Sequence, residues 1–224
     1  MKILALDTSG GACSVALYDT AAEKLLAEER VLIERGHAEL LFSQIELVTE
    51  RGNITLKSID RFAVTTGPGT FTGVRIGLSA ARGFALAAQK PLIGVGSLEV
   101  VAMGAEAPSN AIIVAAFDAR RGELYVQAFQ GGHALAEPMA APPGHAAEML
   151  IRASDGAAIF VIGTGAEMLR AALAAHAART EIAVGEALPR AAVLARLAAT
   201  RAASGAPVMP LYLRAPDAKL PARP

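Results

Sequence analysis

The sequence predicts an α/β protein made of two lobes. Short runs of β-branched or alternating apolar residues are separated by longer apolar runs with helical spacing along the whole 224-residue chain. Three strands followed by alternating helices and strands occur in the first half, and the same order returns in the second half. The segment between the halves, residues 104–110, is rich in Gly, Pro, Ser and Asn. We therefore expect one lobe over residues 1–104 and another over residues 105–224.

The first lobe is predicted to start with three strands that are joined by turn-like segments and form a meander. Alternating helices and strands follow, which gives the order βββαβαβα. The predicted strands are 2–6, 12–18, 24–32, 62–66 and 91–95, and the predicted helices are 37–51, 73–88 and 97–103.

The second lobe is predicted to repeat this order, although its residues are not similar to those of the first. The predicted strands are 111–117, 123–129, 134–139, 158–162 and 181–184, and the predicted helices are 146–152, 167–178 and 191–203. Two facing βββαβα lobes are the architecture shared by actin, the seventy-kilodalton heat-shock chaperones and sugar kinases. The expected fold is therefore this two-lobed actin-like, Hsp70-like and sugar-kinase-like (ASKHA) class.

The composition narrows the possible functions. The 21 Lys and Arg residues are balanced by 21 Asp and Glu residues, so the chain lacks the strongly basic net charge of a nucleic-acid-binding protein, and any contact with RNA must be local or supplied by a partner. Aromatic residues make up only 4% of the chain and Trp is absent, which argues against a base-stacking platform. The apolar run 111–117 is far shorter than the roughly 20 residues that span a bilayer, and no signal peptide is recognisable. We expect a cytoplasmic protein without membrane contact.

The single cysteine, Cys13, cannot form an internal disulfide, which fits a reducing compartment. It alternates with Val15 and Leu17 on a predicted strand. This pattern favours a buried packing role over a nucleophilic one.

Residues 61–88 are the most informative stretch, because a β-branched strand passes through a glycine turn directly into a long helix. Gly73, Gly77 and Ala81 recur every fourth position and share one stripe, where another backbone could approach closely. Arg75 and Arg82 lie two turns apart on a neighbouring stripe. Two interpretations stay open: a core helix packed on its own sheet, or a helix that docks on a second protein.

A nucleotide site is a second candidate. Asp7, Thr8 and Ser9 form the first hairpin turn, which offers free N–H donors and an acid able to hold a metal-bound water. Gly163 and Gly165 lie between a strand and a helix of the second lobe, where an adenosine could rest. Plain turn roles remain open for both segments, since such turns are common in hairpins and before helices.

Several distinctive motifs occur along nearly the whole chain: ILALDTS at 3–9 with ACSVAL at 12–17, GPGTFTGVRIG at 67–77, DAR at 118–120 with GE at 122–123, GTG at 163–165 and PLYLR at 210–214. In their sequence and order they resemble the motifs of the TsaB (YeaZ) family. Members of this family are the dimerisation subunits of the bacterial machinery that makes threonylcarbamoyladenosine beside the anticodon of tRNA.

The resemblance implies that the chain is not itself the transferase. The catalytic paralogue, TsaD, carries two metal-binding histidines four residues apart after the strand that follows the glycine-rich helix. Ser97 and Val101 stand at these two places here, and a serine with a valine makes a poor transition-metal site. The four histidines, His37, His133, His145 and His176, are scattered and form no recognisable metal or Ser-His-Asp constellation. We expect no catalytic residue and no metal site.

The resemblance also implies partners. A TsaD-type subunit would pack against the helices 37–51 and 73–88 in a four-helix interface, and the chain alone would form a homodimer through the same patch. A TsaE-type ATPase is the expected third partner, and tRNA would be reached indirectly through the complex. No tightly bound cofactor is expected, and binding of ATP in the assembled complex stays open. The expected interface residues are Leu41, Ile45, Val48, Gly73, Val74, Arg75, Gly77, Leu78, Ala81 and Arg82.

An ATP-dependent phosphotransferase of the same fold, acting on a small acceptor, is the competing function. Such enzymes have a second glycine-rich hairpin in the second lobe. Here the turn after Asp118 carries Arg120 and Arg121 before its first glycine, which leaves less room for a phosphate. A salt-bridged hairpin tip is the alternative interpretation.

Overall fold

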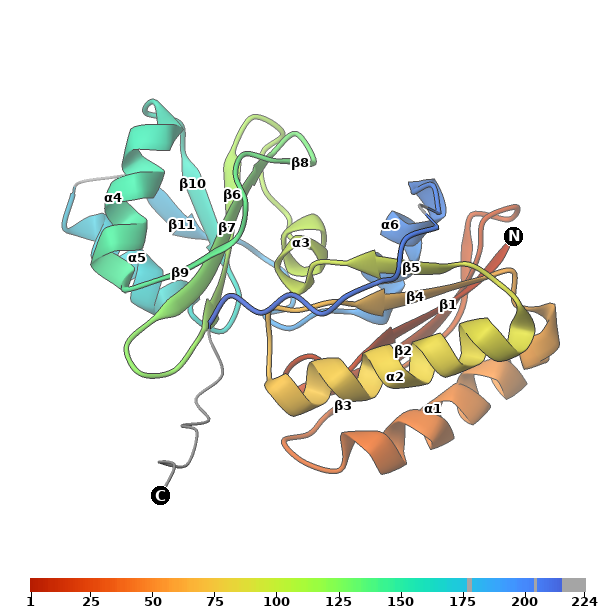
Figure 1. Ribbon diagram of the computed structural model, residues 1–224. Coiled ribbons are helices and arrows are strands. Elements are labelled where there is room, and N and C mark those ends of the chain that lie inside the picture. The colour runs from red at the N-terminus through yellow and green to blue at the C-terminus, as the bar shows by residue number, and fades with distance from the viewer. Residues whose placement is uncertain (177–178, 204, 215–224) are drawn as a thin grey trace, which may run out of the picture.

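The computed structural model describes residues 1–176, 179–203 and 205–214, and it consists of two α/β lobes side by side (Figure 1). Most of the predicted elements are present, with ends that differ by a few residues. No helix in these described ranges is both long and apolar enough to cross a membrane.

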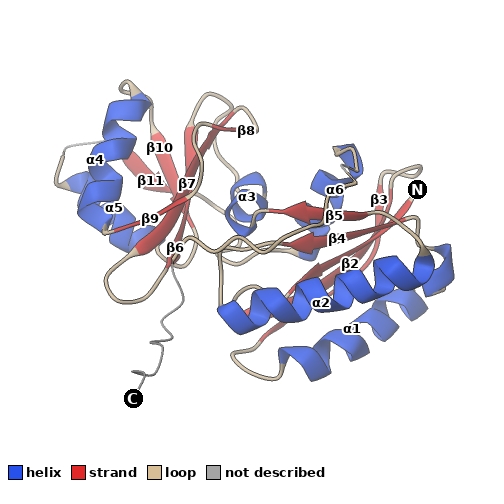
Figure 2. Cartoon of the chain, in the orientation of Figure 1, coloured by secondary structure: helices blue, strands red, loops and turns tan. Residues whose placement is uncertain are grey.

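The first lobe contains a five-stranded sheet in the order β3-β2-β1-β4-β5. The hairpins β1–β2 and β2–β3 are antiparallel, whereas β4 is parallel to both β1 and β5. Helices α1 and α2 cover one face of this sheet (Figure 2). The strands are β1 (Lys2–Asp7), β2 (Ala12–Asp19), β3 (Lys24–Leu32), β4 (Arg61–Thr65) and β5 (Leu92–Val95), and the helices are α1 (His37–Arg51), the 3₁₀ turn η1 (Leu56–Ser58), α2 (Phe71–Ala88) and α3 (Ser97–Met103).

The second lobe repeats this plan around the strand order β11-β10-β6-β7-β8. Its first strand is again antiparallel to the next one and parallel to the strand that follows the first helix. The predicted strand 134–139 is instead two short strands, both paired with β7. The strands are β6 (Ile112–Asp118), β7 (Leu124–Gln130), β8 (His133–Ala134), β9 (Met139–Ala141), β10 (Ile159–Ile162) and β11 (Thr180–Ile182), and the helices are α4 (Pro143–Ser154), α5 (Ala166–Ala174) and α6 (Ala191–Thr200). The duplicated ASKHA topology is thereby confirmed.

The two lobes exchange helices. Helix α6, which follows the second lobe in sequence, covers the open face of the first sheet, where Leu194 packs with Ile3 and Ala16. Helix α3, from the first half of the chain, packs Leu98 and Val101 into a core with strands β6 and β7. The division at residue 104 therefore describes the chain order but not the packing, because each sheet obtains one of its covering helices from the other half.

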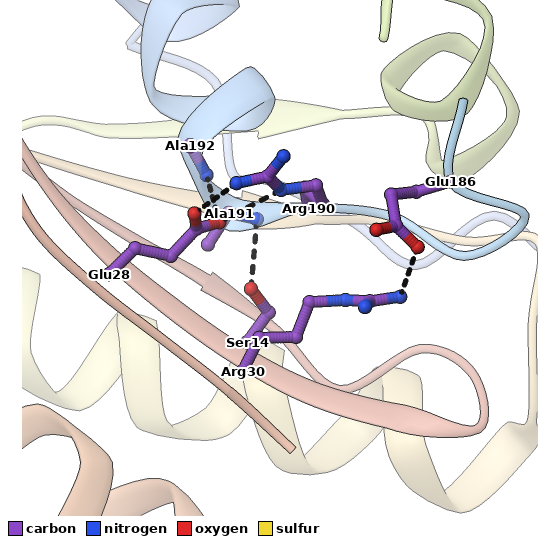
Figure 3. Close-up of polar contacts among 7 residues, drawn as sticks. All are labelled: Ser14, Glu28, Arg30, Glu186, Arg190, Ala191 and Ala192. Atoms are coloured by element: carbon purple, nitrogen blue, oxygen red, sulfur yellow. Dashed lines mark hydrogen bonds and ion pairs between the residues drawn. The ribbon is translucent and has the colours of Figure 1, made fainter. Parts of the chain in front are cut away.

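The start of α6 is capped by side chains of the first sheet (Figure 3). Its own first residues provide no side-chain cap. Instead Ser14 Oγ accepts a hydrogen bond of 3.0 Å from the Ala191 N–H, and Glu28 Oε1 accepts one of 3.4 Å from the Ala192 N–H. Glu28 also pairs with Arg190. Two backbone N–H groups of the first helical turn, which have no partner within the helix, are thus bonded by side chains of strands far away in sequence. These bonds fix the position of the start of α6 on the first sheet.

The last described segment, residues 207–214, runs as an extended strap from the first lobe to the second (Figure 1). The Leu211 N–H donates to the Thr66 carbonyl at 2.8 Å, and Arg82 donates to the Val208 carbonyl. At the far end, Arg214 donates to the Ala119 carbonyl at 3.1 Å and pairs with Glu123. The sequence left the path of this segment open. Residues 215–224 of the predicted tail lie outside the described residues.

The backbone of helix α2 packs directly against the backbone of the first hairpin, with no side chain between them. A Cβ built on Gly73 would be 2.1 Å from the Thr8 carbonyl oxygen, and one on Gly77 would be 2.7 Å from Thr8 Oγ1. Thr8 Oγ1 donates to the Gly73 carbonyl at 2.7 Å. The glycine stripe therefore faces the chain's own sheet, as the core-helix interpretation expected.

Substitution of Gly73 by Ala should lower the free energy of unfolding by about 2–3 kcal/mol, because the new methyl group meets a backbone carbonyl that cannot move aside. Gly144→Ala in helix α4 is the matched control, since a Cβ there meets no atom within 4 Å. It should stabilise the protein by about 0.5–1 kcal/mol through helix propensity. Urea denaturation of both variants measures the difference, and equal effects would contradict the packing.

Replacement of Glu28 by Gln should cost about 1–2 kcal/mol, because it weakens both the cap of α6 and the pair with Arg190. Glu29→Gln on the same strand is the control. Its partner Arg51 is 61% exposed, so that change should cost no more than about 0.5 kcal/mol. Thermal unfolding at low and high salt separates the two, and a larger loss in Glu29→Gln would rule out the capping role.

Candidate functional site

The structure does not present the predicted interface stripe to solvent. The side of α1 and α2 that carries it faces the first sheet, so the prediction that it forms an exposed docking seam is wrong. The physical reason is that the most regular apolar stripe of a helix is the one that packs on its own core. The buried members are Leu41, Ile45, Val48, Gly73, Val74, Gly77, Leu78 and Ala81. Of the predicted residues only Arg75 and Arg82 are exposed.

The outward side of the same two helices nevertheless forms a groove of about 860 Å³. Its walls are almost entirely apolar, and its one charged side chain is Arg75. Large hydrophobic side chains are left in solvent there, with Phe42 54% and Phe71 50% exposed. The lining residues are Ala38, Phe42, Phe71, Thr72, Arg75, Ile76, Ser79, Ala80, Gly83, Phe84 and Ala87.

Aromatic side chains connect the floor of the groove to the core. The Phe84 ring lies 6.0 Å from the Phe42 ring and stacks on the buried Phe62 ring at 6.1 Å, centroid to centroid. Gly83 also lines the groove, and a Cβ built on it would meet no atom within 4 Å. The sequence carried a signal for this face, because Thr72, Ile76, Ala80, Gly83 and Ala87 form a second stripe at helical spacing. It was missed because α2 is apolar on nearly all sides.

Arg75 lines the groove and contacts two aromatic residues, Phe71 and Tyr212. Its guanidinium carbon is 3.6 Å from the centroid of the Phe71 ring, and its Nε donates to the Tyr212 hydroxyl at 2.8 Å. The rings of Phe71 and Tyr212 are themselves 5.4 Å apart. The strap thus contributes a side chain to the edge of the groove.

The second candidate site, the first hairpin, is closed. Asp7 is fully buried; its Oδ1 accepts hydrogen bonds from Ser9 Oγ at 2.6 Å, the Ser9 N–H at 3.2 Å and Thr65 Oγ1 at 2.5 Å. Its Oδ2 has no partner among the described residues. Burial raises the pKa of Asp7, and the hydrogen bonds from Ser9 and Thr65 offset only part of that rise.

The cover over this hairpin is backbone from α2 and its approach. A Cβ built on Gly69 would lie 2.2 Å from the Ser9 carbonyl oxygen, to which the Thr70 N–H donates at 2.8 Å. Leu188 lies over Gly10 on the other side. Asp7, Thr8 and Ser9 are each no more than 1% exposed. A nucleotide can reach them only if this cover moves.

The second predicted half of the nucleotide site has a structural task in its own lobe. Gly163 approaches β6 so closely that a Cβ would lie 2.2 Å from the Ala116 carbonyl, and one on Gly165 would lie 2.5 Å from the Leu124 side chain. Between them, Thr164 Oγ1 accepts a hydrogen bond of 3.1 Å from the Asp118 N–H. These glycines repeat in the second lobe the close contact that Gly69 and Gly73 make in the first.

Four other residues that the sequence analysis considered as possible reactive or metal-binding groups are buried in the protein interior, namely Cys13, His37, Ser97 and Val101. Ser97 is buried and donates to Ser9 Oγ at 3.1 Å, and Val101 is part of the core between the lobes. His37 Nε2 donates to the Gly10 carbonyl at 3.0 Å. Burial of Cys13, as predicted, raises the pKa of its thiol to about 12, with a smaller contribution from Asp7. A thiol with such a pKa is not a nucleophile at neutral pH.

The tip of the second-lobe hairpin supports the salt-bridge interpretation. The Arg120 N–H donates to Asp118 Oδ1 at 2.7 Å, and its guanidinium lies 3.6 Å from the same carboxylate. Arg120, Arg121 and Gly122 have consecutive positive φ angles of 63°, 57° and 76°. Such a tight turn leaves its carbonyls near the strap, and Ala119 is the one that Arg214 contacts.

Comparison with protein families gives a match over residues 31–221 to the family described as TsaD, tRNA N6-adenosine threonylcarbamoyltransferase. A solved structure from Pseudomonas aeruginosa, described as an uncharacterized protein with similarity to peptidase YEAZ, superposes with a TM-score of 0.79 at 28% identity. That superposition covers 95% of this chain and 99% of the other.

Two kinds of relative are similar in sequence. The tRNA threonylcarbamoyladenosine biosynthesis protein TsaB of Escherichia coli is 40% identical over 131 residues, which are 58% of this chain and 55% of that protein. The chain thus spans about half the length of the curated TsaB relatives that it matches. An uncharacterized protein of Mycobacterium tuberculosis is 30% identical over 217 residues, covering 97% of this chain and 93% of the relative. Together with the duplicated fold, these matches show that the chain belongs to the TsaB (YeaZ) family.

Proposed function

We propose that this chain is a non-catalytic docking subunit in the biosynthesis of threonylcarbamoyladenosine in tRNA. The observation that carries the proposal is the exposed, nearly uncharged groove between α1 and α2. An apolar surface of this kind on a lone protein marks an interaction site, because leaving it in water is unfavourable.

A TsaD-type subunit is the partner that fits the groove. The match of residues 31–221 to the TsaD family model implies that such a subunit has the same lobe plan, with two helices at the corresponding place. Two helix pairs of this kind can pack face to face as a four-helix layer. The small residues Ala80, Gly83 and Ala87 on the outward side of α2 would let a partner helix approach closely.

The absence of a catalytic role in this chain is supported by the burial and internal hydrogen bonding of its candidate reactive groups. Asp7 has no exposed surface, Cys13 holds its proton, and Ser97 is spent on a buried hydrogen bond. The competing phosphotransferase would have to open the cover of the first hairpin before any phosphate met Asp7.

The remaining partners follow from the same assembly. A second copy of the chain covers the groove when no TsaD-type subunit is present, giving a homodimer. A TsaE-type ATPase joins the complex, ATP is bound only after assembly, and tRNA is contacted through the complex rather than by this neutral chain alone.

Substitution of Gly83 by Lys should abolish the one-to-one complex with a TsaD-type subunit and convert the homodimer to a monomer. The position tolerates a side chain without a clash, so the fold should persist while a charged chain fills the groove. Gly144→Lys is the matched control, because Gly144 is an equally open helical glycine in α4 of the other lobe. Light scattering after gel filtration gives both masses. A complex that survives Gly83→Lys would refute docking in the groove.

The closed hairpin gives a pH signature. Because the folded-state pKa of Asp7 is raised, its contribution to stability is complete below the unfolded-state pKa of about 4 and is lost as the pH rises through the folded-state value. Asp7→Asn cannot ionise, so the stability of the wild type relative to this variant should fall from about pH 4 upward. Urea titrations at several pH values measure it. Parallel pH profiles would show that the carboxyl is not sealed.

A further inference from the structure

We propose that Arg75, which lies on the Phe71 ring and is hydrogen-bonded to the Tyr212 hydroxyl, is a preformed receptor for a carboxylate of the docking partner. This inference rests on the proposed function, since it describes how the same groove selects its occupant. It assigns to Arg75 and Tyr212 a recognition role that the apolar remainder of the groove cannot supply.

The geometry leaves the binding edge of Arg75 free. One face of its guanidinium lies on the Phe71 ring, at 3.6 Å from the centroid, and Nε is bonded to the Tyr212 hydroxyl. Its two terminal nitrogens have no hydrogen-bond or ion-pair partner in the described part of the chain. A planar guanidinium held this way presents two parallel N–H donors, the arrangement that binds a carboxylate in bidentate fashion.

No acidic residue of α2 competes for the guanidinium of Arg75, because the helix FTGVRIGLSAARGFALAA contains neither Asp nor Glu. None of the other groove-lining residues is acidic. Arginines elsewhere on the molecule, such as Arg51 and Arg170, are paired with a neighbouring glutamate. The charge of Arg75 is therefore left for a group that arrives with the partner.

The strap fixes the position of Tyr212. The Leu211 N–H bonds the Thr66 carbonyl on one side, and Arg214 bonds Ala119 and Glu123 on the other. Tyr212 is held between these two anchors, so Arg75 is ordered before the partner binds. Preorganisation of this kind reduces the entropy lost on association.

A protein carboxylate suits the surroundings better than a nucleic-acid phosphate. A phosphate backbone is bound by several cations along a track, whereas this groove has one cation beside apolar side chains. When an apolar helix covers the groove, the Arg75 pair loses water and becomes both stronger and more selective. The occupant is therefore an apolar helix with an Asp or Glu near one end.

The test is calorimetric titration of the TsaD-type subunit from the same organism into Arg75→Ala, Arg75→Lys and Tyr212→Phe, at two salt concentrations. We expect affinity to fall about 10- to 100-fold for Arg75→Ala. Arg75→Lys keeps the charge but not the planar guanidinium, and Tyr212→Phe keeps the ring but not the hydroxyl. The affinities of these two variants should lie between those of the wild type and Arg75→Ala. The salt dependence of binding should also weaken in Arg75→Ala. Arg170→Ala in α5 is the control, and its affinity should be unchanged.

The outcomes separate this inference from the proposed function. Suppose that Gly83→Lys abolishes the complex while Arg75→Ala binds like the wild type at both salt concentrations. Carboxylate recognition by Arg75 is then refuted, and docking of the partner in the groove is retained. If neither change affects binding, the docking proposal itself fails. If Arg75→Ala instead lowers only the affinity of the assembled complex for tRNA, the ligand is a phosphate and the carboxylate assignment is wrong. Equal melting temperatures of the variants confirm that folding is not the cause.

Discussion

The contact of α2 with the first hairpin is the constraint on which the rest of the structure depends. Gly73 and Gly77 let the helix backbone lie directly on Thr8, and Gly69 lets the preceding loop lie on Ser9. This close approach has two effects at once. It removes Asp7 from solvent, and it rotates the Phe71–Ile76–Phe84 side of α2 outward, where it forms a groove with α1. The burial of Asp7 and the exposure of the apolar groove thus have one geometric cause.

Sequence patterns predicted the element order and the duplicated topology well, because period-2 and period-3.6 spacing report local burial directly. They predicted an exposed interface stripe, whereas all of its residues except Arg75 and Arg82 are buried. Helix α2 is apolar on most sides, so its composition could not tell which stripe faces the sheet, and Leu41, Ile45 and Val48 of α1 follow the ordinary rule that the regular stripe is core. The deciding contacts, between Gly73 and Thr8, join residues 65 positions apart and leave no local trace.

Sequence patterns also could not predict which sheets α3 and α6 cover or the course of the strap. Helical spacing shows that residues 191–200 form an amphipathic helix, but it does not say which sheet they cover. The answer depends on distant partners such as Ser14 and Glu28, which cap the helix from the first sheet. The strap has no periodicity at all. Its position is set by single hydrogen bonds to Thr66 and Ala119, which are invisible until the fold is known.

The placement of α6 also has a consequence for synthesis on the ribosome. One face of the first sheet, including Ile3, Ala5 and Ala16, stays bare until residues 191–200 have been translated. The amino-terminal half of the chain therefore cannot complete its own core as it emerges, in contrast to the usual order in which the earlier domain folds first. The completed first sheet therefore keeps an uncovered apolar face until nearly all of the second half of the chain has been translated.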